Sequence, residues 1–292
     1  MPTTSPTILI AGCGYLGLEL ATRCRARGWR AIGLTRTEDS AAAAARTSGV
    51  EILAADLGDR DSLLAVRDRV PAISLLVHAA SSSRGGPEAY QRVFIDGLAN
   101  LHDVFRPERL VFTSSTSVYG QSDGSQVTEA SPAEPASATS RLLREAEAIA
   151  LAAGGLVARL AGIYGPGRCV VLRKFLDGSA VIEDGGNRVL NHIHRDDAAD
   201  AILAMLVSRD AHGVYNVADD TPLTQLAVYQ AFADHFTLPL PPAGPRPADR
   251  KRGWTSKQVA NTRLRALGWS PRFPSLPDAL LRDTRLVASI HP

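Results

Sequence analysis

The amino-acid sequence predicts an α/β fold, a doubly wound parallel sheet with helices on both faces. Short apolar runs typical of buried strands alternate along the chain with helical runs, and a glycine-rich turn follows the first of them. Polar residues stand where later apolar runs end, and doubly wound sheets bind their ligands at those strand ends. Strands are expected at residues 8–11, 30–35, 51–54, 73–77, 109–113 and 156–160.

The first expected strand leads into a turn with the pattern G-x-G-x-x-G. Gly12 permits the tight turn, Gly14 lets the backbone approach a pyrophosphate, and Gly17 lets the next helix pack closely on the strand. That helix presents N–H groups and the positive end of its dipole to the phosphates. Because the pattern lies between an apolar strand and a helical run, it predicts the dinucleotide site of a Rossmann fold rather than a glycine turn without a ligand. The residues expected to contact the cofactor here are Gly12, Cys13, Gly14, Tyr15, Leu16 and Gly17.

Further cofactor contacts are expected at the ends of the next four strands. Arg36 follows the second strand, at the position that faces the adenosine ribose. An acidic residue there favours NAD, whereas an arginine can pair with the 2′-phosphate of NADP, so NADP is favoured and NAD is the alternative. The other interpretation of Arg36 is a solvated loop arginine. Asp56 either hydrogen-bonds the adenine or caps the helix that follows it. The remaining expected contacts are Leu57, His78, Ala79, Ala80 and Thr113. Residues 78–80 follow the expected strand at 73–77, and the small side chains there are expected to let the cofactor lie over the end of that strand.

Composition and charge narrow the class of protein. The chain has 292 residues, of which 45% are apolar and 21% charged, a balance typical of globular domains. Its net charge of +2 gives no reason to expect nucleic acid or an anionic membrane as a partner. No apolar stretch has membrane-spanning length, and no signal peptide is expected. The spacings of Cys13, Cys24 and Cys169 are unrelated, so we expect neither a disulfide framework nor a metal cluster. This cysteine usage favours a reduced, cytoplasmic setting.

The sequence changes character after residue 160, where turns and prolines become frequent. A loop or hairpin is expected at Val181–Arg188, and Thr224 is expected to cap a helix. The proline-rich span Pro239–Arg246 is either a linker or part of a cleft wall. Beyond a turn-rich segment at 163–168, we expect helices at 198–207 and 225–236 and a strand at 214–218.

Four segments together resemble the motifs of the extended short-chain dehydrogenase/reductase superfamily, in its NAD-dependent epimerase/dehydratase branch. They are the glycine turn, Ser114–Gly120, Arg159 with Tyr164–Arg168, and His194–Ala199, and they occur in the family's order over nearly the whole chain. The resemblance implies a Rossmann domain at residues 1–165 and about 190–218, and a smaller substrate-binding domain at about 166–189 and 219–292. It also implies NAD(P) as cofactor, often a nucleotide sugar as substrate, and a monomer or a homodimer.

The chain departs from this superfamily at the catalytic pair. Family enzymes carry a tyrosine that acts as general acid/base and, four residues later, a lysine that lowers its pKa and holds the nicotinamide ribose. Aligning the acidic end of the helix places Thr139 and Leu143 at these positions. General acid–base assistance is worth about 10²- to 10⁴-fold in rate, so standard hydride chemistry needs another group here. In lacking the pair, and in its segment Asn261–Trp269, the chain resembles the atypical YeeZ-like proteins.

Candidate catalytic residues come from the remaining motif positions. Ser115 matches the residue that hydrogen-bonds the reacting oxygen of the substrate, and Thr139 stands at the tyrosine position. Tyr119 or Tyr164 is the hypothetical acid/base, and the alternative for Tyr119 is a structural anchor of its loop. The expected substrate contacts are Ser81, Ser115 and Arg168.

Other charged residues carry weaker expectations. Arg141 or Arg144 is a candidate for binding the ribose or a phosphate. The pair His192 and His194 lacks the further ligands that a metal site needs, so no metal is expected. Residues 196 and 197 are expected to precede the next helix as its cap and first-turn charge. Further basic candidates for a diphosphate are Arg250, Lys251, Arg252 and Arg263.

The sequence therefore leads to two hypotheses. The first is an NAD(P)-dependent oxidoreductase or epimerase that acts on a nucleotide sugar or a similar polar carbonyl or alcohol. The second is a non-catalytic NADP-binding sensor or regulatory protein that kept the fold and lost the chemistry. The missing tyrosine–lysine pair favours the second, whereas the cleft residues Ser115, Tyr119 and Tyr164 favour the first.

Overall fold

The computed structural model describes residues 5–82, 85–246 and 254–290. The chain forms two compact units, each drawn from several segments. Unit 1 takes Met1–Ser115, Ala138–Arg159 and Ala199–Tyr215, and unit 2 takes Thr116–Ser137, Leu160–Ala198 and Asn216–Pro292. Within the described ranges, no helix is both long and apolar enough to cross a membrane.

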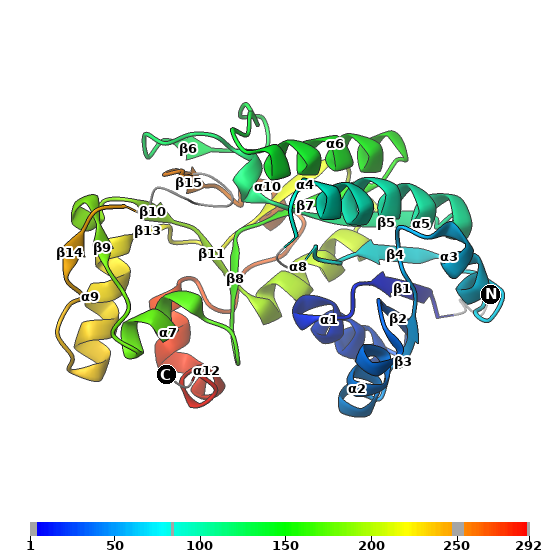
Figure 1. Ribbon diagram of the computed structural model, residues 1–292, viewed down its shortest axis with the longest axis horizontal. Helices are drawn as coiled ribbons and strands as arrows, with labels where there is room; N and C mark the ends of the chain where they lie inside the picture. Colours follow the sequence, from blue (N-terminus) through cyan, green and yellow to red (C-terminus); the bar gives the residue numbers. More distant parts are fainter. Residues whose placement is uncertain (1–4, 83–84, 247–253, 291–292) are drawn as a thin grey trace. The chain divides into compact units, whose positions relative to one another are not determined.

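Unit 1 is built on a seven-stranded sheet with strand order β12-β7-β5-β4-β1-β2-β3 (Figure 1). β1 pairs in parallel with β2 on one side and with β4 on the other, where Ile10 lies opposite Gly33 and Val77. The strand order reverses between β1 and β4, so the switch point of a doubly wound sheet lies at their carboxyl ends. The predicted α/β fold is confirmed. The strands are β1 Thr7–Ala11, β2 Arg30–Thr35, β3 Glu51–Ala54, β4 Leu75–His78, β5 Arg109–Ser115, β7 Leu156–Leu160 and β12 Val214–Val217.

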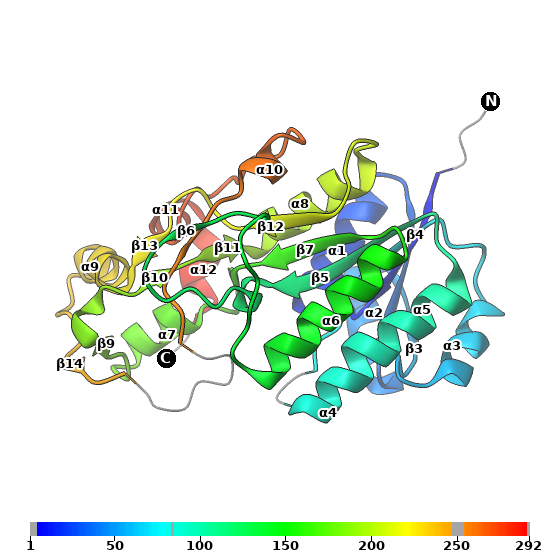
Figure 2. The same ribbon diagram turned by 90° about the horizontal axis from the view of Figure 1, so that it is seen from above.

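Helices cover both faces of this sheet, which is why its central strands read as continuous apolar runs. Figure 1 shows α1 and α2 on one face and α4, α5 and α6 on the other. Figure 2 shows α5 and α6 side by side along the sheet. The helices are α1 Tyr15–Ala26, α2 Glu38–Ser48, α3 Arg60–Arg67, α4 Pro87–Tyr90, the π-helix η1 Gln91–Asp96, α5 Gly97–Phe105, α6 Ala138–Ala152 and α8 Arg195–Val207, which begins in unit 2.

Short polar side chains fix where these helices start. Thr37 accepts the Ser40 N–H at 3.3 Å and caps α2, and Asp59 accepts the Asp61 N–H at 3.0 Å and caps α3. The alternative expectation that Asp56 caps α3 is wrong, because Asp59 already fills that role.

Unit 2 has its own apolar core, in which Phe175, Phe232 and Leu276 are buried. Thr224 accepts the Ala227 N–H at 3.2 Å, so the predicted cap of α9 is confirmed. The helices are the 3-10 turns η2 Thr116–Val118 and η3 Asp184–Gly186, and α7 Val170–Leu176, α9 Gln225–Phe236, α10 Thr262–Arg265, α11 Leu276–Arg282 and α12 Thr284–Ala288.

Short paired strands join the segments of unit 2. They are β6 Gln126–Val127 with β15 Gln258–Val259, β8 Gly162–Tyr164 with β11 His192–His194, β9 Ile182–Glu183 with β14 Ala243–Gly244, and β10 Val189–Leu190 with β13 Leu223–Thr224. Because β9 pairs with β14 and β10 with β13, the segment Val181–Arg188 is not a hairpin, and it contains β9 and η3. β14 lies in the proline-rich span and pairs with β9, so this span is part of unit 2 and not an unstructured linker.

Candidate cofactor site in unit 1

The three glycines of the first turn differ in what surrounds them. Gly12 has a φ of +100°, and a β-carbon there would lie 2.3 Å from the nitrogen and α-carbon of Ala80. A β-carbon on Gly17 would lie 2.1 Å from the carbonyl oxygen of Gly12, so the helix packs directly on the turn. A β-carbon on Gly14 would meet nothing within 4 Å. These surroundings are those expected for a tight turn at Gly12, a close helix contact at Gly17 and an approach of phosphate at Gly14.

The backbone of the turn is tied to β2 and leaves the start of α1 open to an anion. The N–H groups of Gly12 and Cys13 donate to the Leu34 carbonyl at 3.0 and 2.8 Å, so the protein itself uses them. The N–H groups of the first turn of α1, at Leu16 and Gly17, have no acceptor inside the helix. No acidic residue lies in that turn. The N-terminus of this 12-residue helix therefore fits a pyrophosphate.

Both the backbone N–H and the thiol of Cys13 have partners within the protein. Its Sγ lies 3.6 Å from the Ile10 carbonyl oxygen, and burial raises the pKa of the thiol to about 12. A β-carbon on Gly33 would lie 2.3 Å from that sulfur, so the side chain of Cys13 needs a glycine in β2. Sequence reasoning missed Gly33, although a glycine inside a strand commonly marks such a close approach.

The ends of β1, β4 and β5 are held together by polar contacts. The Ala79 N–H donates to the Ala11 carbonyl at 2.7 Å, and Thr113 Oγ1 donates to the His78 carbonyl at 2.9 Å. His78 is fully buried, and its Nε2 donates to the Val93 carbonyl at 2.9 Å. Burial lowers the pKa of this ring, which stays neutral. Position 78 therefore borders the glycine turn only through its backbone, and Ala79 and Ala80 are the residues in contact with Gly12.

The expected adenosine end of the site carries a cluster of charges. Arg36 is exposed just after β2. Asp56, just after β3, accepts Arg92 Nη2 at 2.8 Å and the Gly58 N–H at 2.9 Å. The hydrogen bond from Arg92 holds the pKa of Asp56 below its usual range, and the charge of Arg36 acts in the same direction. Leu57 is buried, and its carbonyl accepts a hydrogen bond from an α5 side chain.

The expected catalytic positions of unit 1 lie on β5 and α6. Ser115 is the last residue of β5 and is half-buried. Ser81, an expected substrate contact, follows β4 and is exposed. Thr139 and Leu143, which the sequence aligns with the family's tyrosine–lysine pair, are 6% and 2% exposed on α6.

One turn further along α6, Glu147 forms a buried ionic cluster that sequence reasoning missed. Ser114 Oγ donates to Glu147 at 2.6 Å, and Arg159 donates to it through Nε at 3.0 Å and Nη2 at 2.7 Å. Arg144 also bonds the same carboxylate. The signals in the sequence are a glutamate among apolar residues of a helix and Arg159, which belongs to one of the family motifs but has no partner evident from the sequence. The cluster fixes the strand position directly before Ser115.

The two candidate tyrosines lie in unit 2, and both hydroxyls are bound there. Tyr119 is fully buried, and its hydroxyl lies 2.8 Å from Asn216 Oδ1 and 3.0 Å from the Thr128 carbonyl oxygen. The Tyr164 hydroxyl donates to the Ser275 carbonyl at 3.2 Å, and burial raises its pKa well above the ordinary value. These contacts are those of structural anchors. Arg168 and Arg141 are exposed and Arg263 is half-buried, whereas Arg250, Lys251 and Arg252 lie outside the described residues.

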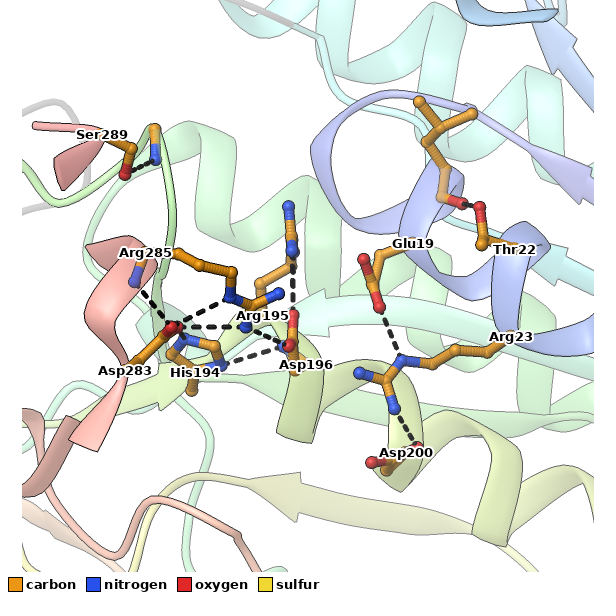
Figure 3. A network of polar contacts seen from close by, with 12 residues as sticks. Glu19, Thr22, Arg23, His194, Arg195, Asp196, Asp200, Asp283, Arg285 and Ser289 are labelled. Atoms are coloured by element: carbon orange, nitrogen blue, oxygen red, sulfur yellow. Dashed lines mark hydrogen bonds and ion pairs between the residues drawn. The ribbon is translucent and has the colours of Figure 1, made fainter. Parts of the chain in front are cut away.

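A polar network in unit 2 surrounds the start of α8 (Figure 3). His194 Nε2 donates to Asp283 at 3.1 Å, and its Nδ1 accepts the Asp196 N–H at 3.2 Å. Asp196 also pairs with Arg285 at 2.9 Å, and Asp197 accepts two backbone N–H groups, of residues 272 and 273. The expected first-turn charge is confirmed, because Asp196 and Asp197 lie in the first turn of α8. The expectation that they precede the helix is wrong, because α8 begins at Arg195.

Within unit 1, Figure 3 also shows how α1 is joined to α8. Arg23 pairs with Glu19 at 2.8 Å and with Asp200 at 2.7 Å. Among the described residues, no group of histidine, cysteine and acidic side chains is arranged to hold a metal ion.

A doubly wound sheet with a G-x-G-x-x-G turn at its switch point defines a Rossmann-like protein. The model of the NAD dependent epimerase/dehydratase family matches residues 8–218, and the chain belongs to this family.

Two proteins of known sequence and one solved structure are similar to this chain. Protein YeeZ of Escherichia coli K12 is 32% identical over 72% of this chain and 76% of its own length. A 3-diazoavenalumate denitrifying reductase of Streptomyces is 31% identical over 94% of this chain and 99% of its own length. The UDP-glucose 4-epimerase of Thermus thermophilus, solved in complex with NAD, has a TM-score of 0.78 at 21% identity over 96% of this chain and 97% of that one. At that identity the epimerase shows a shared fold only.

Proposed function

We propose that this chain is an NAD(P)-dependent oxidoreductase that acts on a small polar substrate without the tyrosine–lysine pair of its superfamily. One observation supports the proposal: the glycine turn is complete, whereas Thr139 and Leu143, which we align with the positions of the pair, are buried on α6. When bound, the cofactor supplies or accepts a hydride. The N-terminus of α1 would hold the pyrophosphate, and Ser115 would orient the reacting oxygen of the substrate.

The proposed direction is reduction. Epimerisation at a carbinol needs a proton to be removed and returned, and loss of general acid–base assistance costs about 10²- to 10⁴-fold at each such step. A reduction needs proton delivery once, and the substrate or solvent can supply it. The Streptomyces relative, which matches almost the whole chain, is a reductase by name and supports this direction.

For the substrate, we propose a nucleotide sugar or a compound of similar polarity and charge. The nucleotide sugar is suggested by the family and by its UDP-glucose epimerases. The substrate-binding domain would be the part at about 166–189 and 219–292, and Ser81, Ser115 and Arg168 stay the proposed substrate contacts. Tyr119 and Tyr164 are not retained as the proposed acid/base, because both hydroxyls are bound to protein acceptors.

For the cofactor, we propose NADP. The exposed guanidinium of Arg36 follows β2, where the adenosine ribose lies in this fold, and arginine suits a 2′-phosphate. Calorimetric titration with NADP⁺ and NAD⁺ tests this on wild type, Arg36→Ala and the control Arg46→Ala, which removes an exposed arginine of α2. We expect Arg36→Ala to weaken NADP⁺ about 10-fold and to leave NAD⁺ within twofold. Failure of both cofactors to bind wild type would refute the proposed function.

A second candidate function is a non-catalytic NADP-binding regulator, favoured by the same buried Thr139 and Leu143. The two candidates differ in hydride transfer. We expect the oxidoreductase to oxidise C4-deuterated NADPH with transfer of deuterium to a 4-keto sugar nucleotide or another polar carbonyl compound. Cofactor that binds tightly but transfers no deuterium to any compound of such a panel would favour the regulator.

A further inference from the structure

Arg92 reaches from the π-helix η1 to the loop that follows β3. Its Nη2 lies 2.8 Å from Asp56 Oδ2. A β-carbon on Gly58 would lie 2.4 Å from Arg92 Cγ and 2.9 Å from its Nε, so the side chain crosses the loop where only a glycine leaves room. The contact joins residues 36 positions apart in the sequence, and the loop is shaped to receive it.

The backbone that carries Arg92 is fixed independently of this ion pair. The next residue, Val93, accepts His78 Nε2 at 2.9 Å through its carbonyl. A β-carbon on Gly97 would lie 2.9 Å from Leu57 Cβ, and Asn100 Nδ2 donates to the Leu57 carbonyl at 3.0 Å. The π-helix and α5 are thus held against the ends of β3 and β4. Removal of the Arg92 guanidinium would therefore leave the local backbone in place.

The charges in this cluster act on one another. Asp56 is 36% exposed at its side chain, and both of its oxygens are engaged, one by Arg92 and one by the Gly58 N–H. β2 and β3 pair in parallel with Thr35 opposite Ala54, and the Ala55 N–H donates to the Thr35 carbonyl at 2.7 Å, so Arg36 and Asp56 follow the ends of neighbouring strands. The charge of Arg36 accordingly lowers the pKa of Asp56. The carboxylates that face Arg92 are Asp56, Asp59, which caps α3, and Asp96, which accepts the amide of Gln91.

We propose that Arg92 determines cofactor specificity by neutralising Asp56. An unpaired carboxylate at the end of the strand next to that of Arg36 would repel the dianionic 2′-phosphate that Arg36 attracts, whereas the Asp56–Arg92 pair presents almost no net charge. Arg92 is a positioning residue in this scheme and acts through Asp56 without contact to the phosphate. The inference rests on the proposed use of NADP and adds a second determinant to Arg36.

The test uses the full-length chain and two probes, adenosine 2′,5′-bisphosphate and ADP, in calorimetric titrations. The variants are Arg92→Gln, Asp56→Asn and the double variant. The matched control is Arg67→Gln, which removes an exposed arginine paired with Asp68 in the same unit. We expect Arg92→Gln to weaken the 2′,5′-bisphosphate about 3- to 10-fold at low salt, and to change ADP less than twofold. The loss should shrink at high salt, because exposed charges are screened.

The double variant decides between a neutralising and a contacting arginine. Because the repulsion requires the Asp56 charge, we expect the double variant to bind the 2′,5′-bisphosphate within twofold of Asp56→Asn alone. A double variant as weak as Arg92→Gln would overturn the inference, since the arginine would then contact the phosphate itself. Unchanged binding by Arg92→Gln, or equal losses for both probes, would overturn it while leaving the proposed function intact. Binding of neither probe by wild type would refute the proposed function as well.

Discussion

Gly12 and Ala80 approach each other so closely that a β-carbon on Gly12 would lie 2.3 Å from both the nitrogen and the α-carbon of Ala80. The turn after β1 and the segment after β4 therefore pack backbone against backbone at the switch point of the sheet. The φ of +100° at Gly12 adds a second reason why only glycine fits. The geometry of the candidate cofactor site thus depends on a contact between two backbone segments, without any side chain.

The first prediction follows from this contact. Gly12→Ala should lower the free energy of unfolding by about 2 kcal/mol or more, because it combines a backbone clash with a strained φ. Gly14→Ala is the matched comparison, since its β-carbon would meet nothing within 4 Å. We expect Gly14→Ala to lose at most about 1 kcal/mol, mainly as a weaker helix cap, yet to bind NADP⁺ at least about 10-fold more weakly. Denaturant unfolding and calorimetry measure both effects, and equal stability of the two variants would contradict this.

The second prediction concerns the buried carboxylate of Glu147. Glu147→Gln leaves the buried guanidinium of Arg159 without its counter-charge, and breaking a buried pair in this way costs about 3–5 kcal/mol. Glu145→Gln, at an exposed position two residues earlier on α6, should change the free energy of unfolding by less than about 0.5 kcal/mol. Equilibrium unfolding in urea at pH 7 measures both. A loss below about 1 kcal/mol in Glu147→Gln would show that the cluster is not a stabilising element.

The third prediction is a pH dependence from His194. Burial lowers the pKa of this ring from 6.5 to about 4, so between these values the unfolded chain binds a proton that the folded chain does not. Stability from this group is therefore lost as the pH falls from 6.5 to 4, by up to about 3 kcal/mol. The carboxylates Asp196 and Asp283, whose pKa values are lowered, begin to lose their contribution below about pH 5 and lose most of it below the range measured.

The measurement for His194 is the free energy of unfolding of wild type and His194→Gln at several pH values from 4 to 7. We expect the wild type to lose more stability than the variant as the pH falls, while His192, also shifted to about 4, contributes equally to both. His235→Gln, at an exposed position on α9, should follow the wild type. Parallel curves for wild type and His194→Gln would contradict the prediction.

The fourth prediction is a pH dependence from Lys257, at alkaline rather than acidic pH. Lys257 is 4% exposed, and its Nζ lies 3.1 Å from the Tyr119 carbonyl oxygen and 2.9 Å from Thr255 Oγ1. Burial and the nearby charge of Arg188 lower its pKa from 10.5 to about 8. Between these values the unfolded chain holds the extra proton, so this group stabilises the fold as the pH rises through that window.

Lys257→Met tests this expectation. We expect the stability of wild type relative to Lys257→Met to increase between pH 8 and 10.5 by up to about 3 kcal/mol. Lys174→Met, at an exposed position of α7, should show no such change relative to wild type. Thermal or urea unfolding across this range provides the values. A constant difference between wild type and Lys257→Met would show that the amine titrates normally.

The sheet could be predicted from the sequence because its signals are local. The apolar runs at 30–35, 51–54 and 156–160 coincide with β2, β3 and β7, since a strand covered on both faces must be apolar throughout. Thr224 was identified as a cap for the same reason: its hydroxyl serves an N–H group three residues away.

The contacts around the site could not be predicted, because their partners are distant in the sequence. Asp56 meets Arg92 and His78 meets Val93 only after the strands have assembled. Asp196 looked like a helix cap, yet its carboxylate pairs with Arg285, 89 residues away. In the sequence, Thr224 and Asp196 both read as a short polar residue before a helix. Tertiary packing decides whether such a side chain bonds the helix backbone or a distant side chain.

The burial of all three cysteines has a practical consequence. Burial raises the pKa of Cys13 and Cys24 to about 12 and that of Cys169 to about 11, so the folded chain presents almost no thiolate to an alkylating reagent. Cys13 and Cys24 belong to unit 1 and Cys169 to unit 2. Mass spectrometry of pulse-alkylated protein would therefore count, without any introduced label, how often each unit opens on its own.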